Sequence, residues 1–312
     1  MKSKNALYAP ALLCVIYMLT GFSDRLIALL GDLSDSVLLS AAIIQCLVFL
    51  LPVAFYCRVR NINFLTALNL KPIPPSILGF AVLSFLLYFT GGAILKYAAQ
   101  AFWLVPETAA PALTDLYPGQ TALLVVSYVI LPAVLEELVF RSILIHEYRP
   151  YGGVLAIGVS ALSFAMLHFS FQGFPEAFLA GLVFAAVTYV CQSVLPAVLL
   201  HLANNALNVF LPDVFSQYVA RTGNSVMLFY LLVAAFLLFM YLWLGQLEYI
   251  YSKKAADLSR DRRAQLLLLE SERSVQEQLK PPSFWQRAKE VCLSPGWLVA
   301  VALFFLKATG AL

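Results

Sequence analysis

The sequence predicts an all-α membrane protein, a polytopic bundle of about eight transmembrane helices with a cytoplasmic N-terminus. Of its 312 residues, 62% are hydrophobic and only 12% are charged, and the mean hydropathy is +0.84. A soluble globular domain is about half apolar and about one quarter charged. The length accommodates about eight helices of roughly 20 residues each, so no large soluble domain is expected.

Eight apolar runs, each nearly free of charge, are bounded by charged or Gly- and Pro-containing connections. They lie at about 8–22, 37–57, 76–103, 120–146, 153–170, 176–191, 194–211 and 226–250. The first run follows a basic start, as in a signal peptide, but no Ala-x-Ala-like cleavage site follows it, so we expect a membrane helix. A short run at 297–306 precedes Lys307 and predicts either a re-entrant or interfacial segment or a ninth span.

Charges alternate in sign along the connections. Basic residues precede the first run, aspartates dominate the next connection, and the one after it contains Arg58, Arg60 and Lys71. Because Lys and Arg concentrate in cytoplasmic loops, this pattern places the N-terminus in the cytoplasm. The net charge of +3 reflects topology, and no nucleic-acid partner is expected. We expect an integral, multi-pass protein, and the short loops favour a prokaryotic plasma membrane.

Residues 251–290 are strongly charged, and we expect a cytoplasmic arm that is helical in its first part. Its "QLLLLE" stretch would lie on the membrane surface or on a partner, or belong to a solvated linker. The five Cys are scattered through the sequence without metal-type spacing, which predicts packed thiols.

Ionisable side chains inside apolar runs are costly and call for a partner or a function. The fourth run contains Glu136, Glu137 and Arg141, the fifth contains His168, and the seventh contains His201, Asn205 and Asn208. Glu137 and Arg141 are four residues apart and predict an ion pair on one helix face. Glu136 points about 100° away and needs another partner. His201, Asn205 and Asn208 predict a polar stripe that faces inward.

These residue types match the needs of a hydrolase that acts on an amide or ester in a membrane cavity. A desolvated carboxylate is a competent general base toward water, and a nearby His can position that water or donate a proton to the leaving group. A second His and an Asn amide can stabilise an oxyanion. Glu136, His168 and His201 would alternatively hold a catalytic Zn²⁺, although the HExxH spacing is absent.

Three short motifs resemble those of the CPBP/Abi family of intramembrane proteases, which is related to the type II CAAX prenyl endopeptidases. "EELVFR" at 136–141 is similar to the family's EExxxR motif, "FAMLH" at 164–168 to FxxxH, and "HLANN" at 201–205 to HxxxN. The order and the apolar context make the set specific, and the resemblance covers about residues 75–212. It divides the chain into N-terminal helices at 1–74, this catalytic core, a last transmembrane helix at 213–250, and an arm with a short hydrophobic segment at 251–312.

The resemblance implies an intramembrane endopeptidase with a peptide or protein substrate, lipidated or not. Glu136 would activate water with help from His168, His201 and Asn205 would form the oxyanion site, and Glu137 and Arg141 would support the architecture. The family resemblance further implies a cavity open to the cytosol. Between glutamate-activated water without a metal and a zinc mechanism, we expect the former, so no cofactor is required.

One geometric conflict accompanies this assignment. If the fifth run is helical from Gly153, His168 lies about 22 Å along it, whereas Glu136 lies only about 15 Å from the end of its own helix. Either the preceding turn extends to about Gly158 or the fourth helix projects beyond the bilayer. Pro132 is expected to kink that helix.

Two alternative functions stay open. The same fold can serve a non-catalytic membrane adaptor or bacteriocin-immunity protein. Buried Glu and His also build proton relays in transporters, although no inverted repeat is evident in the sequence.

Overall fold

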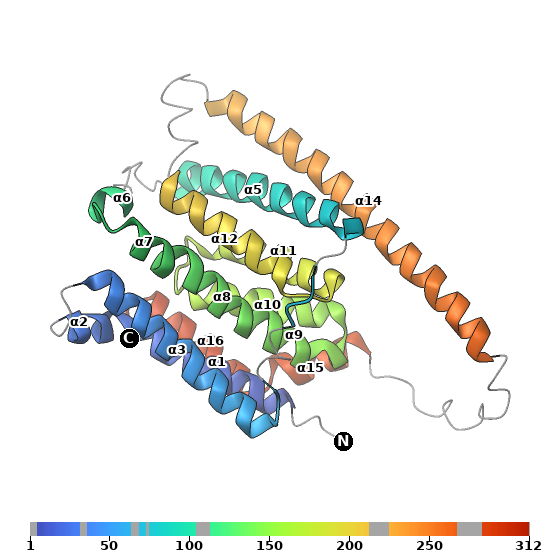
Figure 1. Ribbon diagram of the computed structural model, residues 1–312, viewed down its shortest axis with the longest axis horizontal. Coiled ribbons are helices and arrows are strands. Elements are labelled where there is room, and N and C mark those ends of the chain that lie inside the picture. The colour runs from blue at the N-terminus through green and yellow to red at the C-terminus, as the bar shows by residue number, and fades with distance from the viewer. Residues whose placement is uncertain are drawn as a thin grey trace.

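The computed structural model describes residues 5–31, 36–63, 69–72, 75–103, 113–211, 225–266 and 283–311. Every regular element within these ranges is helical, which confirms the all-α bundle. Figure 1 shows the long helices running roughly side by side, with α14 (Ser225–Leu266) outermost beside α5 (Pro75–Trp103).

The remaining helices follow the expected apolar runs closely. In chain order they are α1 (Asn5–Gly21), α2 (Ser23–Gly31), α3 (Val37–Arg60), α6 (Leu113–Leu116), α7 (Thr121–Leu124), η1 (Val125–Ile130), α8 (Leu131–Glu137), η2 (Leu138–Leu144), α9 (Ile145–Tyr148), η3 (Arg149–Tyr151), α10 (Gly153–Leu167), α11 (Phe174–Cys191), α12 (Leu195–Phe210), α15 (Phe284–Cys292) and α16 (Pro295–Ala308).

Within the described ranges, five helices are long and apolar enough to cross a membrane, and a sixth span results if the bent pair α15 and α16 counts as one. Three shorter apolar helices have 10–17 residues, at Tyr8–Gly21, Gly153–Leu167 and Leu195–Phe210. The chain is therefore an integral, multi-pass membrane protein. The total of about eight spans and the orientation of the N-terminus stay predictions.

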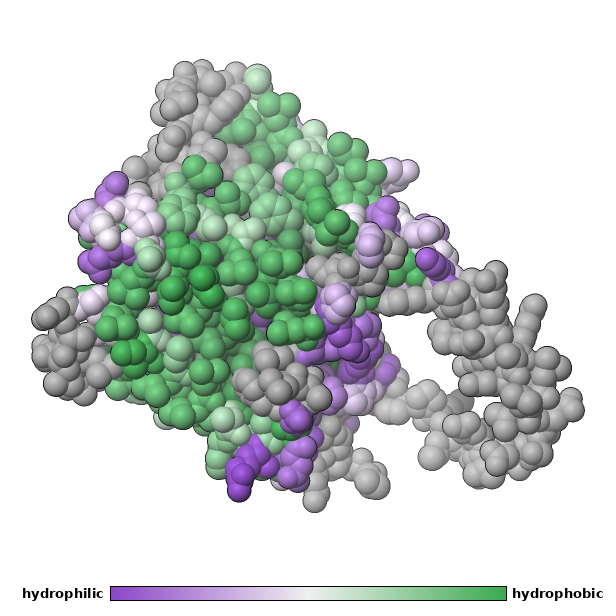
Figure 2. All heavy atoms as spheres, viewed as in Figure 1, coloured by the Kyte–Doolittle hydropathy of each residue, from purple (hydrophilic) through white to green (hydrophobic). Residues whose placement is uncertain are grey.

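The outer surface is suited to lipid. Hydrophobic residues cover most of the face shown in Figure 2, and hydrophilic residues gather toward its ends. Large apolar side chains point outward, for example Phe55 on α3, which is 72% exposed, and Tyr241 on α14, which is 75% exposed. In water a continuous surface of this kind would promote association, whereas in a bilayer it is the expected exterior.

Small residues bring the inner helices close together. A Cβ atom at Gly181 on α11 would lie only 2.8 Å from the Cα atom of Ala161 on α10, and one at Gly91 on α5 would lie 2.7 Å from the Leu179 side chain. Such contacts let backbones approach and maximise packing between membrane helices. They hold α10 and α11, whose connection follows His168, in a defined arrangement.

The turn between the fourth and fifth apolar runs ends before Gly158, the limit that one of the two expectations gave it. The helical run that starts at Thr121 continues to Tyr151, and Gly152 then reverses the chain with φ +108°, a backbone conformation open mainly to glycine. Because this single residue makes the turn, α10 begins at Gly153, and an extension to Gly158 is wrong. The fourth helix instead continues to Tyr151, past the expected end of its apolar run at 146, and its projection beyond the bilayer stays a prediction.

The charged arm is helical at first, as expected, because α14 continues without a break to Leu266. The "QLLLLE" stretch runs into residues 267–282, which lie outside the described residues. The short run at 297–306 falls within α16, which joins α15 at a bend of 61°.

Candidate active site

Glu136 and Glu137 lie on α8, a helical segment flanked on both sides by wider π-helical turns, η1 and η2. Pro132 is the second residue of α8 and has no N–H to donate to the preceding turn. The Leu131 N–H bonds instead to the Val126 carbonyl, five residues back, which is the π-type pairing. The expected irregularity near Pro132 is therefore a widened turn directly before the two carboxylates.

The predicted ion pair is present inside the bundle. The Arg141 Nη1 atom donates to Glu137 Oε1 at 2.9 Å, and neither side chain is exposed. The guanidinium also lies over the rings of Phe164 and Phe184, with its carbon 4.2 Å and 5.4 Å from the ring centroids. An aromatic face attracts a cation, so Arg141 is held by one carboxylate and at least two rings.

Glu137 also contacts a helix more distant in sequence. Its Oε1 atom lies 2.8 Å from Nδ1 of His201 on α12. A carboxylate only accepts hydrogen bonds, so Nδ1 donates to Oε1. Glu137 thus orients the His201 ring.

Glu136 faces the other side of the same imidazole. Its Oε2 atom lies 3.9 Å from His201 Nε2, and its side chain is 14% exposed. Among the described residues no group donates a hydrogen bond to this oxygen. His201 is therefore held between two carboxylates, one bonded to Nδ1 and one that remains available near Nε2.

His168 lies at the end of α10 and is exposed. Its Nδ1 atom is 3.0 Å from the Phe164 carbonyl oxygen, and its ring contacts the Phe164 ring, which in turn contacts His201. Within the described ranges, no hydrogen bond or ion pair joins His168 to Glu136. Among these residues His168 and Glu136 therefore share no direct polar contact, and the Phe164 ring connects His168 to His201.

The polar face of α12 is shorter than expected. Asn205 Nδ2 lies 3.5 Å from the Val129 carbonyl oxygen in the widened turn η1. Asn204 donates to Asn205 at 3.4 Å and accepts from the Tyr88 hydroxyl at 2.8 Å. Asn208 is exposed, so its predicted inward position is wrong: it lies one turn further along α12, near the helix end at Phe210.

Tyr88 and Phe164 are part of the site although neither carried a chemical signal of its own in the sequence. Phe164 contributes its ring to Arg141, His168 and His201. Only its position in "FAMLH" singled it out. Tyr88 lies in another helix, α5, and no local spacing pointed to it.

The residues fit a metal centre poorly. Among the described residues, no group of three or more His, Cys, Asp and Glu side chains is arranged to hold a metal ion. The expected zinc ligand set requires Glu136, His168 and His201 together, whereas His168 packs on the Phe164 ring and its Nδ1 atom is engaged by the Phe164 carbonyl oxygen. We derive no step through a metal.

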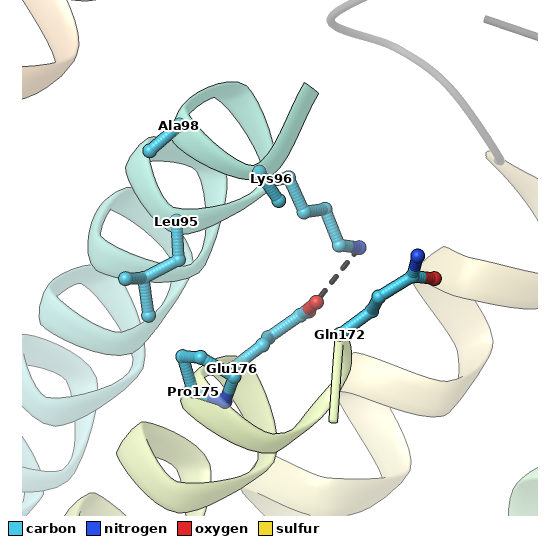
Figure 3. Close-up of a pocket in the computed structure, with 7 residues that line it drawn as sticks. Leu95, Lys96, Ala98, Gln172, Pro175 and Glu176 are labelled. Carbon is cyan, nitrogen blue, oxygen red and sulfur yellow. Dashed lines mark ion pairs between the residues drawn. The ribbon is translucent and has the colours of Figure 1, made fainter. Parts of the chain in front are cut away.

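A separate pocket of about 320 Å³ lies between α5 and the start of α11. Figure 3 shows Lys96 and Glu176 facing each other across it, with Nζ and Oε1 3.2 Å apart. Leu95, Ala98 and Pro175 supply apolar walls. None of the residues that line this pocket belongs to the candidate active site around Glu136. Glu176 is therefore a carboxylate outside that site and can serve as a control.

Comparisons with known proteins agree with the motifs. Residues 118–207 match the family model described as "Type II CAAX prenyl endopeptidase Rce1-like", which confirms the resemblance to the CPBP and CAAX proteases. The matched stretch contains Glu136, Glu137, His168 and His201. Searches of the curated proteins and of the solved structures found no match.

Proposed function

We propose that this chain, which carries an Rce1-like segment at residues 118–207, is an intramembrane endopeptidase that hydrolyses a peptide bond with water activated by Glu136. The family match supports a protease in general. The observation that carries the finer proposal is the position of His201, 2.8 Å from Glu137 and 3.9 Å from Glu136. In this arrangement Glu136 is the base, His201 carries the proton and Glu137 orients His201.

In the proposed reaction, Glu136 removes a proton from a water molecule whose oxygen attacks the carbonyl carbon. Glu136 suits this role because its Oε2 atom is buried without a protein donor, so its lone pairs are available to accept a hydrogen bond and then a proton from water. The His168 ring, with Nδ1 at the Phe164 carbonyl, keeps Nε2 free to accept a hydrogen bond from the same water.

The proton then passes from Glu136 to Nε2 of His201. The resulting imidazolium is stabilised by Glu137, which accepts from Nδ1 at 2.8 Å. It donates from Nε2 to the oxyanion of the tetrahedral intermediate, and the Asn205 amide is the second donor. Finally the C–N bond breaks and the nitrogen takes the proton from Nε2, which gives an amine and a carboxylic acid. The acid then passes its proton to the amine or to water and leaves as a carboxylate.

We propose a peptide or protein substrate that reaches the site within the membrane, with or without an attached lipid. No metal takes part in this scheme. The cell membrane of a prokaryote remains our expectation for its location, because the described connections are short.

The test compares peptides released from membranes that contain equal amounts of the wild-type protein or of Glu136→Gln. General base catalysis contributes about 10²- to 10⁴-fold, so peptide termini seen with the wild type should be lost in this variant. Glu176→Gln is the matched control, since its carboxylate lies in the separate Lys96 pocket, and it should cleave normally.

Equal cleavage by Glu136→Gln would reject Glu136 as the base. Identical peptide profiles for all three proteins, with a substrate pool present, would favour a non-catalytic adaptor or immunity protein on the same fold.

A further inference from the structure

The short helix α15 carries both exposed aromatic and exposed basic side chains. It begins at a capping box, in which Ser283 and Gln286 each accept the other's backbone N–H through a side-chain oxygen. Two reciprocal bonds define this N-terminus. The helix therefore has a well-defined start, even though it has only nine residues.

α15 leaves the neighbouring helix α16 at a sharp angle. It joins α16 at a bend of 61°, and α16 runs beside α1, with Cys14 Sγ 3.3 Å from the Gly296 carbonyl oxygen. Because α16 and α1 are apolar helices inside the bundle, a helix that leaves α16 at such an angle runs across its end.

The inner face of α15 is anchored to the turn between α9 and α10. The Tyr151 hydroxyl donates to Glu290 at 3.4 Å, and an Arg287 guanidinium nitrogen lies 3.2 Å from the position of a Cβ atom on Gly152. Val291 on the same face is fully buried. This turn lies at the end of the bundle that the Lys and Arg distribution predicts to be cytoplasmic.

The outward part of α15 has two chemically different sides. Trp285, Lys289 and Cys292 follow each other at spacings of four and three, so they share one side of the helix. All three are exposed, Trp285 by 73%. Gln286 and Glu290 share the other exposed side. One side is thus aromatic, basic and apolar, and the other is polar and acidic.

We propose that the side formed by Trp285, Lys289 and Cys292 binds the headgroup region of anionic phospholipids in the membrane that holds the bundle. An indole ring prefers the boundary between hydrocarbon and water, and an ammonium group near it attracts lipid phosphate. The charge of the chain fits this partner, since residues 251–290 contain nine Lys or Arg and six Asp or Glu. Gln286 then faces water, and Glu290 stays beside the Tyr151 hydroxyl.

The experiment uses the full chain in vesicles of phosphatidylcholine and phosphatidylglycerol. The fluorescence difference between the wild type and Trp285→Phe isolates the emission of Trp285, because the other three Trp contribute to both. Brominated forms of the two lipids then report which lipid contacts the indole. We expect quenching by both lipids, with a preference for phosphatidylglycerol.

Lys289→Gln should lower this preference about fivefold, the effect of one basic group near an anionic surface. Lys307→Gln, which removes a charge at the far end of α16, should leave it unchanged. Emission of Trp285 that is quenched by aqueous iodide and not by brominated lipid would overturn the membrane contact. Equal quenching by the two lipids in the wild type would overturn the anionic preference. Neither readout depends on cleavage, so the outcome is independent of the proposed protease.

Discussion

Glu137 has two possible roles, which mutations can distinguish. It balances the charge of Arg141, and it orients His201 through a hydrogen bond. Glu137→Leu removes the carboxylate and leaves the Arg141 guanidinium, which is fully buried, without its counter-charge. Breaking a buried pair in this way costs about 3–5 kcal/mol of stability. Replacing both partners, as Glu137→Leu with Arg141→Met, removes the uncompensated charge, and such apolar replacements are often neutral or stabilising.

Activity should respond differently from stability in these two variants. Both lose the oxygen that accepts from His201 Nδ1 at 2.8 Å, so the imidazole is free to rotate or to change tautomer. A misplacement of about 1 Å in a catalytic group can cost about 10²-fold in rate. We therefore expect the double variant to recover the unfolding midpoint of the wild type and to remain at least about 10²-fold slower.

The assay measures unfolding midpoints in detergent and initial cleavage rates on the same preparations. Glu147→Leu is the matched control, because Glu147 forms a second largely buried pair with Arg60 at 3.2 Å, on α9 and α3. It should lose stability, yet the folded fraction should cleave at the normal rate. If the double variant regains both stability and activity, Glu137 serves the architecture alone and the positioning role is refuted.

Three further outcomes follow from the geometry. Asn205→Ala should lower kcat about 10²- to 10³-fold by removing an oxyanion donor. Asn204→Ala loses the hydrogen bond from Tyr88 and should mainly cost about 1 kcal/mol of stability. Equal kcat values for the two variants would contradict the assignment of Asn205. Cleavage should persist in the presence of a chelator, measured on protein washed free of metals, and loss of activity that added Zn²⁺ restores would overturn the metal-free scheme. Gly181→Val should destabilise the bundle by about 1–3 kcal/mol or more, because the new Cβ atom would meet the Ala161 backbone. Gly158→Ala is the control in the same thermal melt and should be neutral, since there is open space around its Cβ position.

The helices were predictable because lipid imposes a simple rule on the sequence. Backbone groups in a bilayer must be paired within a helix, so each spanning segment is a long apolar run. The Glu137 and Arg141 pair was predictable for a similar local reason, since residues four apart on a helix are neighbours. Both inferences depend only on the chain's own periodicity.

Contacts between helices followed no such local rule. His201 lies sixty-four positions from Glu137, and nothing in either motif states which nitrogen meets which carboxylate. The inward position of Asn208 failed because a stripe on a helix wheel ignores where the neighbouring helices end. Helix lengths alone predicted different depths for His168 and Glu136, and they could not anticipate the widened turns or the single-residue reversal at Gly152.

The adjacent glutamates explain each other's roles. Two consecutive positions on a helix diverge by about 100°, so one arginine and one histidine nitrogen can satisfy Glu137 without reaching Glu136. Bound at 2.9 Å and 2.8 Å, the Glu137 Oε1 atom is committed to those partners and is not available to a water molecule. That commitment fixes His201, whose free nitrogen then lies toward the carboxylate that has no protein donor. A site with one carboxylate would have to choose between orienting the histidine and activating water, whereas the pair allows both at once.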